Sequence, residues 1–217
     1  IVRTAIASGL NVKGIMRGYA GLLNEEIIDM DKQSVSEIMR RGGTILYTAR
    51  CKEFMTEEGQ QKAAEILTKH GIDGLIVIGG DGSFRGAQKL SALGINTIGI
   101  PGTIDLDIAC TDYTIGFDTA VNIAVEAIDR IADTSEAHSC FSVVEVMGRR
   151  AGFIALWSGI AGSARAIFAD SNTTAEQIVD HLRKYHFTSG TIVKSFPSSQ
   201  ADIWASTVGA ALSDIQF

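Results

Sequence analysis

The chain has few of the features that mark a membrane, secreted or nucleic-acid-binding protein. No apolar run approaches the ~20 residues of a membrane-spanning helix, and the N-terminal residues lack a signal-peptide pattern. The three cysteines, Cys51, Cys110 and Cys140, have no CxxC spacing, so reduced thiols in a cytoplasmic protein are expected rather than disulfides or a zinc site. A net charge of −6 without a basic run argues against a nucleic-acid partner. Any anionic substrate must therefore be met by individual arginines.

The hydrophobic pattern indicates an α/β fold. With 217 residues, the chain can form one large domain or two small lobes. Short apolar runs alternate with helical patterns, which predicts strands near 12–16, 75–78, 97–100 and 141–146 and helices near 56–70, 83–93 and 118–132. The runs Leu75 to Ile78 and Thr97 to Ile100 are interpreted as short buried strands. Right-handed βαβ units of this kind predict a doubly wound parallel sheet.

Two glycine-rich loops with carboxylates each follow one of these strands. In the first, Gly79 to Ser83 (GGDGS), glycines allow backbone amides to approach a phosphate. A helix is predicted to begin near Ser83, and its positive N-terminal end would attract the phosphate. Asp81 is unfavourable beside bare phosphate, so its natural use is to bind a phosphate-bridging Mg²⁺. An isolated motif of this kind is equally typical of a tight turn in which Asp caps the helix.

The second loop, Pro101 to Asp107 (PGTIDLD), places two more carboxylates after the next strand. If the loop is extended, side-chain alternation sends Thr103, Asp105 and Asp107 to the same side. Three polar groups would then face one ligand site at the carboxyl edge of the sheet, where open α/β sheets bind ligands. The alternative is an exposed acidic turn.

These two loops resemble the nucleotide and catalytic loops of the ATP-dependent 6-phosphofructokinase family. Further stretches that resemble the family are 18–22, 41–50, 111–120 and 144–149. The resemblance implies a phosphofructokinase-like doubly wound sheet with an ATP-binding lobe over 1–116 and a second, smaller α/β lobe for the sugar phosphate over 117–217. It also implies a chain of roughly two-thirds the length of such an enzyme.

The implied activity is glycolytic transfer of phosphate from ATP, with Mg²⁺, to fructose 6-phosphate, which yields fructose 1,6-bisphosphate. By the same resemblance the protein is a cytoplasmic homo-oligomer, the family's tetramer, with a nucleotide effector. Glycine at Gly82 and Gly102 accompanies ATP in the family, whereas pyrophosphate-dependent relatives carry Asp and Lys there.

The resemblance assigns roles to individual residues. Asp105 is the general base for the sugar 1-hydroxyl, and Thr103 and Arg149 complete the catalytic set. The residues expected to bind the sugar phosphate are Thr103, Asp105, Asp107, Met147, Gly148 and Arg149. Those expected to bind the nucleotide are Gly80, Asp81, Gly82, Ser83, Arg50 and Cys51. Asp81 is the expected metal ligand, and Arg3 matches an effector-site arginine.

Several positions depart from the family pattern. Leu106 replaces a family asparagine, and Cys140 stands where the family supplies an arginine across a subunit interface. The stretch 191–196 lacks a sugar-binding glutamate. These losses keep open a second reading, a non-catalytic nucleotide-binding or assembly subunit on the same scaffold. A dinucleotide-binding oxidoreductase is disfavoured, because Gly79-Gly80-Asp81-Gly82 does not fit GxGxxG and places an acid at the pyrophosphate.

Overall fold

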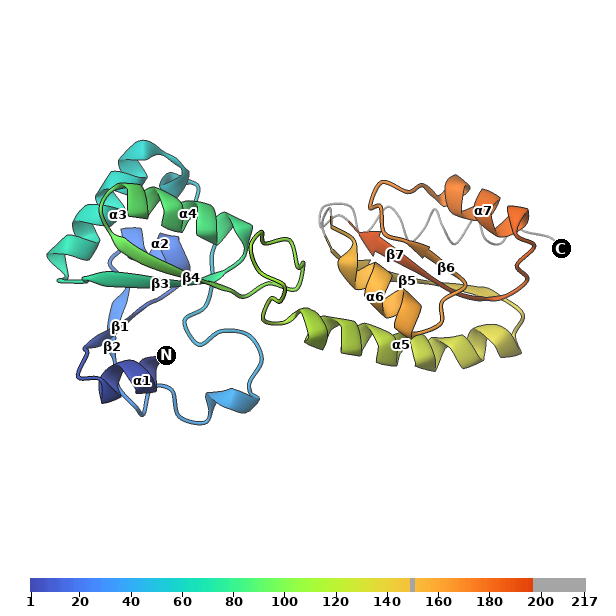
Figure 1. Ribbon diagram of the computed structural model, residues 1–217, viewed down its shortest axis with the longest axis horizontal. Coiled ribbons are helices and arrows are strands. Elements are labelled where there is room, and N and C mark those ends of the chain that lie inside the picture. Colours follow the sequence, from blue (N-terminus) through green and yellow to red (C-terminus); the bar gives the residue numbers. More distant parts are fainter. Residues whose placement is uncertain (149–150, 197–217) are drawn as a thin grey trace. The chain divides into compact units, whose positions relative to one another are not determined.

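The computed structural model describes residues 1–148 and 151–196 (Figure 1). The chain forms two compact units, Ile1–Ile100 and Pro101 onward. These units are defined by packing, whereas the lobes expected over 1–116 and 117–217 are defined by the ligands they would bind. The division into an ATP-binding lobe and a sugar-phosphate lobe therefore stays a prediction. Within the described residues, no helix is both long and apolar enough to cross a membrane.

The first unit contains two small sheets and four α-helices. Strands β1 and β2 pair antiparallel, whereas β3, helix α4 and β4 follow one another as a strand–helix–strand unit. The Asn96 side-chain amide donates to the Asp73 carbonyl at 3.1 Å, so β3 and β4 start side by side. The elements are α1 (Val2–Ala7), β1 (Val12–Ile15), α2 (Gly18–Leu23), β2 (Ile27–Met30), the 3₁₀ turns η1 (Ile38–Arg40) and η2 (Glu53–Met55), α3 (Glu57–Lys69), β3 (Gly74–Gly79), α4 (Asp81–Ala92) and β4 (Asn96–Pro101).

Helix α3 forms where the sequence pattern predicts it. The Thr56 side chain caps the helix by accepting a hydrogen bond from the Gly59 amide at 3.1 Å. Ala63 and Leu67 are completely buried on one face, where they join the apolar cluster of this unit. The chain leaves the helix at Gly71, whose φ of +63° lies in the left-handed region that glycine adopts readily.

Strands β3 and β4 contain only half-buried and exposed residues, so the prediction of buried strands is wrong. Helices α3 and α4 lie over one side of the pair (Figure 1), and Leu75 packs there against the apolar cluster. On these strands Ile76, Ile78 and Ile98 are 45%, 59% and 65% exposed. A run that is apolar on both sides is typical of a strand with other elements packed on both of its faces. The sequence of the run does not specify which element would pack against the second face.

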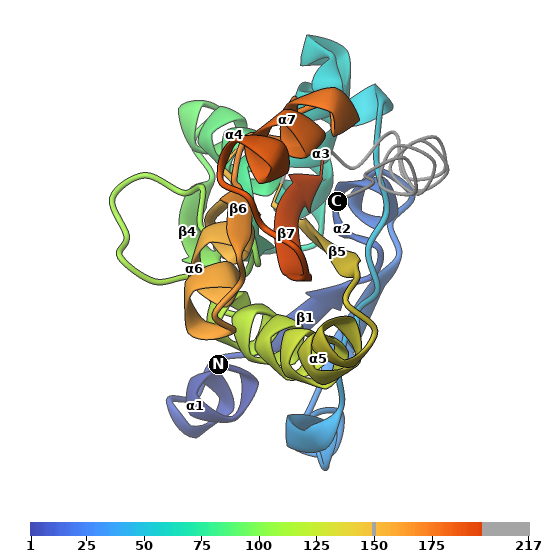
Figure 2. The same cartoon turned by 90° about the vertical axis from the view of Figure 1, so that its right-hand side faces the viewer.

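The second unit is a three-stranded parallel sheet between helices. Its strand order is β5-β7-β6, and both pairings are parallel. Figure 2 shows α7 on one side of this sheet and α5 on the other. The elements are α5 (Phe117–Ala137), β5 (Phe141–Met147), α6 (Phe153–Ala161), β6 (Ala166–Phe168), α7 (Ala175–Lys184) and β7 (Gly190–Phe196). The α/β fold with parallel strands is thus confirmed.

Side-chain alternation divides the core of this unit between the two faces of the sheet. Ile192 packs with Ile178 and Leu182 of α7, whereas its neighbour Val193 packs with Ile128 of α5. Lys194 again lies on the α7 side, directly opposite Glu145 of β5, and is completely buried. Burial lowers the pKa of Lys194, and the negative charges of Glu145 and Asp170 partly oppose that shift.

Trp157 of α6 differs from the expectation of a core residue. Its side chain is 57% exposed and touches the ring of Phe117 edge-on, with centroids 6.2 Å apart. Helix α6 buries Ile154 and Ala155 instead. An apolar helix cannot bury its whole circumference against a single sheet, so its pattern does not say which residues become exposed.

Candidate functional site

The GGDGS turn joins β3 directly to α4. Gly80 is the N-cap of α4, without a side-chain cap, and Asp81 is its first residue, so the helix begins two residues earlier than predicted. The first N–H groups of a helix have no intrahelical acceptor, and they carry the positive end of the helix dipole. A Cβ at Gly79 would lie 2.5 Å from Ser83 Oγ, so the tight turn requires glycine there. The turn therefore presents free amides and a carboxylate at one strand end.

The Asp81 carboxylate is accessible and forms an ion pair with Arg85. Arg85 Nε donates to Asp81 Oδ1 and Arg85 Nη2 lies near Oδ2, each at 3.1 Å, while the two side chains are 77% and 39% exposed. Exposed pairs at this helical spacing are typically worth only about 0.3–0.5 kcal/mol, so an incoming cation can replace the guanidinium. In the part of the chain that the structure describes, no three His, Cys, Asp or Glu residues gather as a metal site. One carboxylate plus ligand phosphates fits Mg²⁺, which commonly keeps most of its other ligands as water.

Tyr19 of α2 contacts the same turn, and sequence reasoning did not identify it as a site residue. Its hydroxyl donates to the Ser83 carbonyl at 2.7 Å, across 64 positions of the sequence. The ring stacks on Phe54 at 3.9 Å between centroids, and a Cβ at Gly86 would come within 2.6 Å of it. Burial raises the pKa of Tyr19 to about 12. Only its place in the 18–22 stretch of family resemblance could have indicated this residue.

The remaining predicted residues of the first unit lie outside regular secondary structure or at its start. Arg50 is exposed in the segment between η1 and η2, and the next residue, Cys51, is half-buried against the apolar cluster. Arg3 is exposed in the short helix α1. Their roles toward nucleotide and effector stay predictions.

The second loop is closed at its base and held by apolar contacts. The Ile115 amide donates to the Pro101 carbonyl at 2.8 Å, which brings the two ends of the loop together. Within the loop, Thr103 Oγ1 accepts a hydrogen bond from the Asp105 amide at 3.2 Å. Ile104 and Leu106, the two neighbours of Asp105, pack against the buried cluster that includes Phe117, so the backbone on either side of Asp105 is anchored.

The expectation of an extended loop is wrong, because the chain turns at Leu106. Leu106 has a φ of +55°, so strand alternation cannot place Thr103, Asp105 and Asp107 on one side. Asn enters the left-handed region more readily than other side chains with a Cβ, which gives a physical reason for the family's asparagine at this position. Leu106 instead packs against the cluster around Phe117. This apolar contact offsets part of the free-energy cost of a left-handed backbone at leucine.

The third predicted segment follows β5. Met147 is 57% exposed at the end of the strand, and Gly148 is buried. A Cβ at Gly148 would lie 2.9 Å from the Ser195 hydroxyl oxygen, so the close approach of β7 favours glycine. Arg149 lies outside the described residues. Cys140, at the other end of β5, is exposed.

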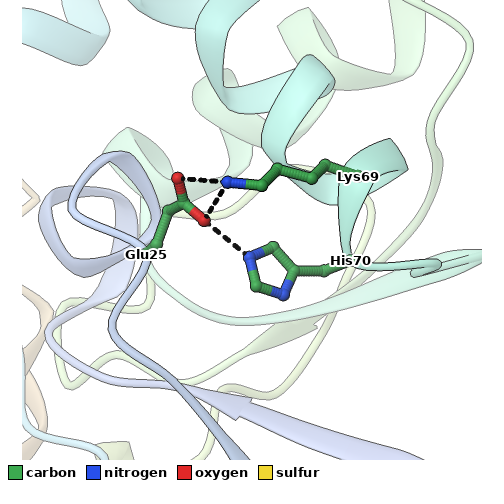
Figure 3. A network of polar contacts seen from close by, with 3 residues as sticks. All are labelled: Glu25, Lys69 and His70. Carbon is green, nitrogen blue, oxygen red and sulfur yellow. Dashed lines mark hydrogen bonds and ion pairs between the residues drawn. The ribbon is translucent and has the colours of Figure 1, made fainter.

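A separate polar network joins the turn that follows α2 to the end of α3. Figure 3 shows Glu25 between Lys69 and His70: the Lys69 amine donates to both carboxylate oxygens at 2.8 and 2.9 Å, and His70 Nε2 lies 2.8 Å from Oε2. Hydrogen bonds with Lys69 and then His70 lower the pKa of Glu25. The charged carboxylate therefore stabilises the folded state at pH values above its ordinary pKa of 4.5, and this contribution is lost as the pH falls through the lowered pKa.

We expect Glu25→Gln to reduce stability slightly at neutral pH and to make the loss of stability in acid less steep. The effect should shrink in high salt, because all three partners are accessible to solvent and ions screen such pairs. Urea unfolding at neutral pH and at about pH 3 measures the difference. Glu65→Gln, at an exposed position of α3, is the matched control; equal behaviour of the two variants would contradict the expectation.

Comparison with known proteins places the chain in a family. The family model described as Phosphofructokinase matches residues 1–200. The ATP-dependent 6-phosphofructokinase of Clostridium botulinum (strain Hall) is 64% identical over 167 residues, which cover 77% of this chain and 52% of that protein. The protein of the same name from Clostridium acetobutylicum is 62% identical over the same length and coverage.

Solved structures agree with this assignment. The structure of phosphofructokinase from Saccharomyces cerevisiae has a TM-score of 0.80 and 31% identity, and the match covers 98% of this chain and 33% of that one. The structure of a pyrophosphate-dependent phosphofructokinase from Marinobacter aquaeolei has a TM-score of 0.73 and 24% identity, and the match covers 97% of this chain and 59% of that one. At this identity the match supports the fold alone.

An α/β protein with a glycine-rich, acid-bearing turn between a strand and a helix belongs to a class suited to binding phosphates. Within that class, the chain belongs to the phosphofructokinase family. It spans about half the length of the curated relatives that it matches.

Proposed function

We propose that this chain carries the MgATP-binding and phosphoryl-transfer residues of an ATP-dependent 6-phosphofructokinase, which phosphorylates fructose 6-phosphate to fructose 1,6-bisphosphate. The observation that carries the proposal is the turn at the start of α4. It places free helix amides and the accessible Asp81 carboxylate at the carboxyl end of β3. Both a phosphate and its Mg²⁺ can be held there by groups of opposite charge.

Several observations support ATP as the phosphoryl donor. Gly82 is exposed, and the structure leaves open space where a side chain at this position would begin. An aspartate there, as in pyrophosphate-dependent relatives, would bring a second negative charge to a phosphate-binding turn. The Clostridium relatives that are more than 60% identical to this chain are named ATP-dependent.

The transfer step needs a base and positive charge. Asp105 is the proposed base: it takes the proton of the sugar 1-hydroxyl as that oxygen attacks the γ-phosphorus, the bond from the γ-phosphorus to the β-phosphate oxygen breaks, and ADP leaves. Thr103 accepts a hydrogen bond from the Asp105 amide. Arg50 and Arg149 are the proposed partners of the transferring oxygens, because phosphoryl transfer depends mainly on positioning and on neutralised charge. Asp81 would hold Mg²⁺, whose chemistry there would be to neutralise negative charge on the nucleotide phosphates.

The sugar-phosphate half of the proposed site has fewer cations. Cys140 is a thiol at the position where the resemblance places an arginine of the neighbouring subunit, and it is exposed where such a residue would have to reach a partner. Each charge-assisted contact is typically worth roughly 1.5–3 kcal/mol. We therefore propose weaker binding of fructose 6-phosphate than of MgATP, in a homo-oligomer of the kind that the family forms.

Calorimetric titration of the chain with ATP, with and without Mg²⁺, tests the first half of the proposal. Binding at or below millimolar nucleotide that strengthens with Mg²⁺ is expected. A coupled assay for fructose 1,6-bisphosphate tests the second half. Mg²⁺-dependent binding of ATP without turnover would favour a non-catalytic nucleotide-binding subunit. If the chain did not bind ATP, both the enzyme and the nucleotide-binding subunit would be excluded.

A further inference from the structure

The hydroxyl of Tyr19 is joined to the phosphate-binding turn in a way that ring packing does not require. The ring is already fixed by its stacking on Phe54 and its close approach to Gly86. The hydroxyl nevertheless donates to a backbone carbonyl of the first turn of α4, that of Ser83. Since Gly80 gives this helix no side-chain cap, Tyr19 holds the turn from outside the helix.

A chain of hydrogen bonds leads from this hydroxyl to the start of the helix. Tyr19 donates to the Ser83 carbonyl at 2.7 Å. That carbonyl belongs to the same peptide group as the Phe84 amide, which donates to the Gly80 carbonyl at 3.1 Å. The Gly80 carbonyl in turn shares its peptide group with the Asp81 amide. Asp81 is the first residue of α4, so its N–H has no acceptor within the helix.

We propose that Tyr19 is a positioning residue for the phosphate-binding turn, which fixes the first turn of α4 and polarises the Asp81 amide toward a bound phosphate. The inference rests on the proposed function, because it takes that turn as the phosphate site. Each donated hydrogen bond polarises the peptide group that accepts it, and such chains strengthen each bond by about 10–30%. The Asp81 amide thereby becomes a stronger donor at the place where negative charge would arrive.

The acid–base state of the phenol suits this role. Burial raises the pKa of Tyr19 to about 12, so the hydroxyl keeps its proton and remains a donor throughout the physiological range. An ionised phenolate would have no proton to donate, and its negative charge would repel the Ser83 carbonyl oxygen. The hydrogen-bond chain consequently runs in one direction, from the phenol to the helix start.

Tyr19→Phe removes only the hydroxyl and keeps the ring that stacks on Phe54. Thr97→Val is the matched control: the Thr97 hydroxyl donates to the Ala87 carbonyl at 3.5 Å, on the same helix but beyond its first turn. Both variants should remain folded, as judged by urea unfolding. The full chain is then titrated with ATP, inorganic tripolyphosphate and adenosine in the presence of Mg²⁺.

For Tyr19→Phe we expect roughly two- to fivefold weaker binding of both ATP and tripolyphosphate, from one weakened charge-assisted bond. Adenosine binding should not change, and Thr97→Val should bind all three like the wild type. In the nucleotide-free chain, the Phe84 amide proton of Tyr19→Phe should move upfield and exchange faster with solvent, since its hydrogen bond to Gly80 is weakened.

Two results would overturn the inference alone while the proposed function stands. One is wild-type binding of tripolyphosphate that Tyr19→Phe leaves unchanged, and the other is a loss confined to adenosine, which would make Tyr19 a contact of the base. If the wild-type chain binds neither ATP nor tripolyphosphate, the proposed function fails and the inference fails with it.

Discussion

Replacing Asp105 by asparagine should lower the transfer of phosphate from ATP to fructose 6-phosphate by about 10²–10⁴-fold, the usual contribution of a general base. The amide has nearly the same shape as the carboxylate but cannot accept the proton of the attacking hydroxyl. The loop should keep its conformation, because the Pro101–Ile115 hydrogen bond and the Ile104 packing do not involve the carboxylate. Transfer of radiolabelled phosphate from ATP to the sugar measures the change.

Asp112→Asn is the control for that experiment, since Asp112 is an exposed carboxylate of the same closed loop. It should leave the rate within a small factor of the wild type. A rate that falls equally in both variants would indicate a general effect of loop charge, and an unchanged rate in Asp105→Asn would move the base elsewhere. Absence of turnover in the wild type, with MgATP bound, would favour the non-catalytic alternative.

Removal of the Asp81 carboxylate should abolish most of the Mg²⁺-dependent part of ATP binding. A charge-assisted contact is typically worth roughly 1.5–3 kcal/mol, so Asp81→Ala is expected to weaken MgATP binding by about tenfold or more. Binding of ATP without Mg²⁺ should weaken less or even improve, because the variant removes a negative charge from the turn and frees Arg85. Titrations at several Mg²⁺ concentrations separate these terms.

The matched control is Asp73→Asn, at an exposed position just before the opposite end of β3. Its carboxylate lies at the strand start, so it should not alter the dependence on Mg²⁺. Both variants should unfold at urea concentrations close to that of the wild type. If ATP binding responds to Mg²⁺ equally in Asp81→Ala and in the wild type, the metal lies elsewhere.

Local patterns in the sequence were enough to predict the elements that carry the two loops. Thr56, the spacing of Ala63 and Leu67, and Gly71 define α3, because a cap, an apolar face and a left-handed residue act within a few positions of one another. The GGDGS and PGTIDLD stretches pointed to the family by residue identity, which the match over residues 1–200 confirms. The alternation of strands and helices likewise predicted an α/β fold with parallel strands, which the second unit has.

Features that depend on contacts between distant residues could not be predicted from local sequence patterns. The exposure of Ile76 and Trp157 depends on what packs against a sheet face or a helix, and an apolar pattern does not specify that partner. The left-handed backbone at Leu106 is set by the closed loop around it, against the preference of a leucine side chain.

The sequence alone therefore determined the family and much of the secondary structure, since both follow from short-range pattern or identity. Only the tertiary structure decided how the candidate site residues are held. The hydrogen bond from Tyr19 to Ser83 joins residues 64 positions apart. The pairing of β7 with β5 likewise places Lys194 opposite Glu145, a residue of another strand. Such contacts arise when packing brings separate segments together, and no local preference of either segment encodes them.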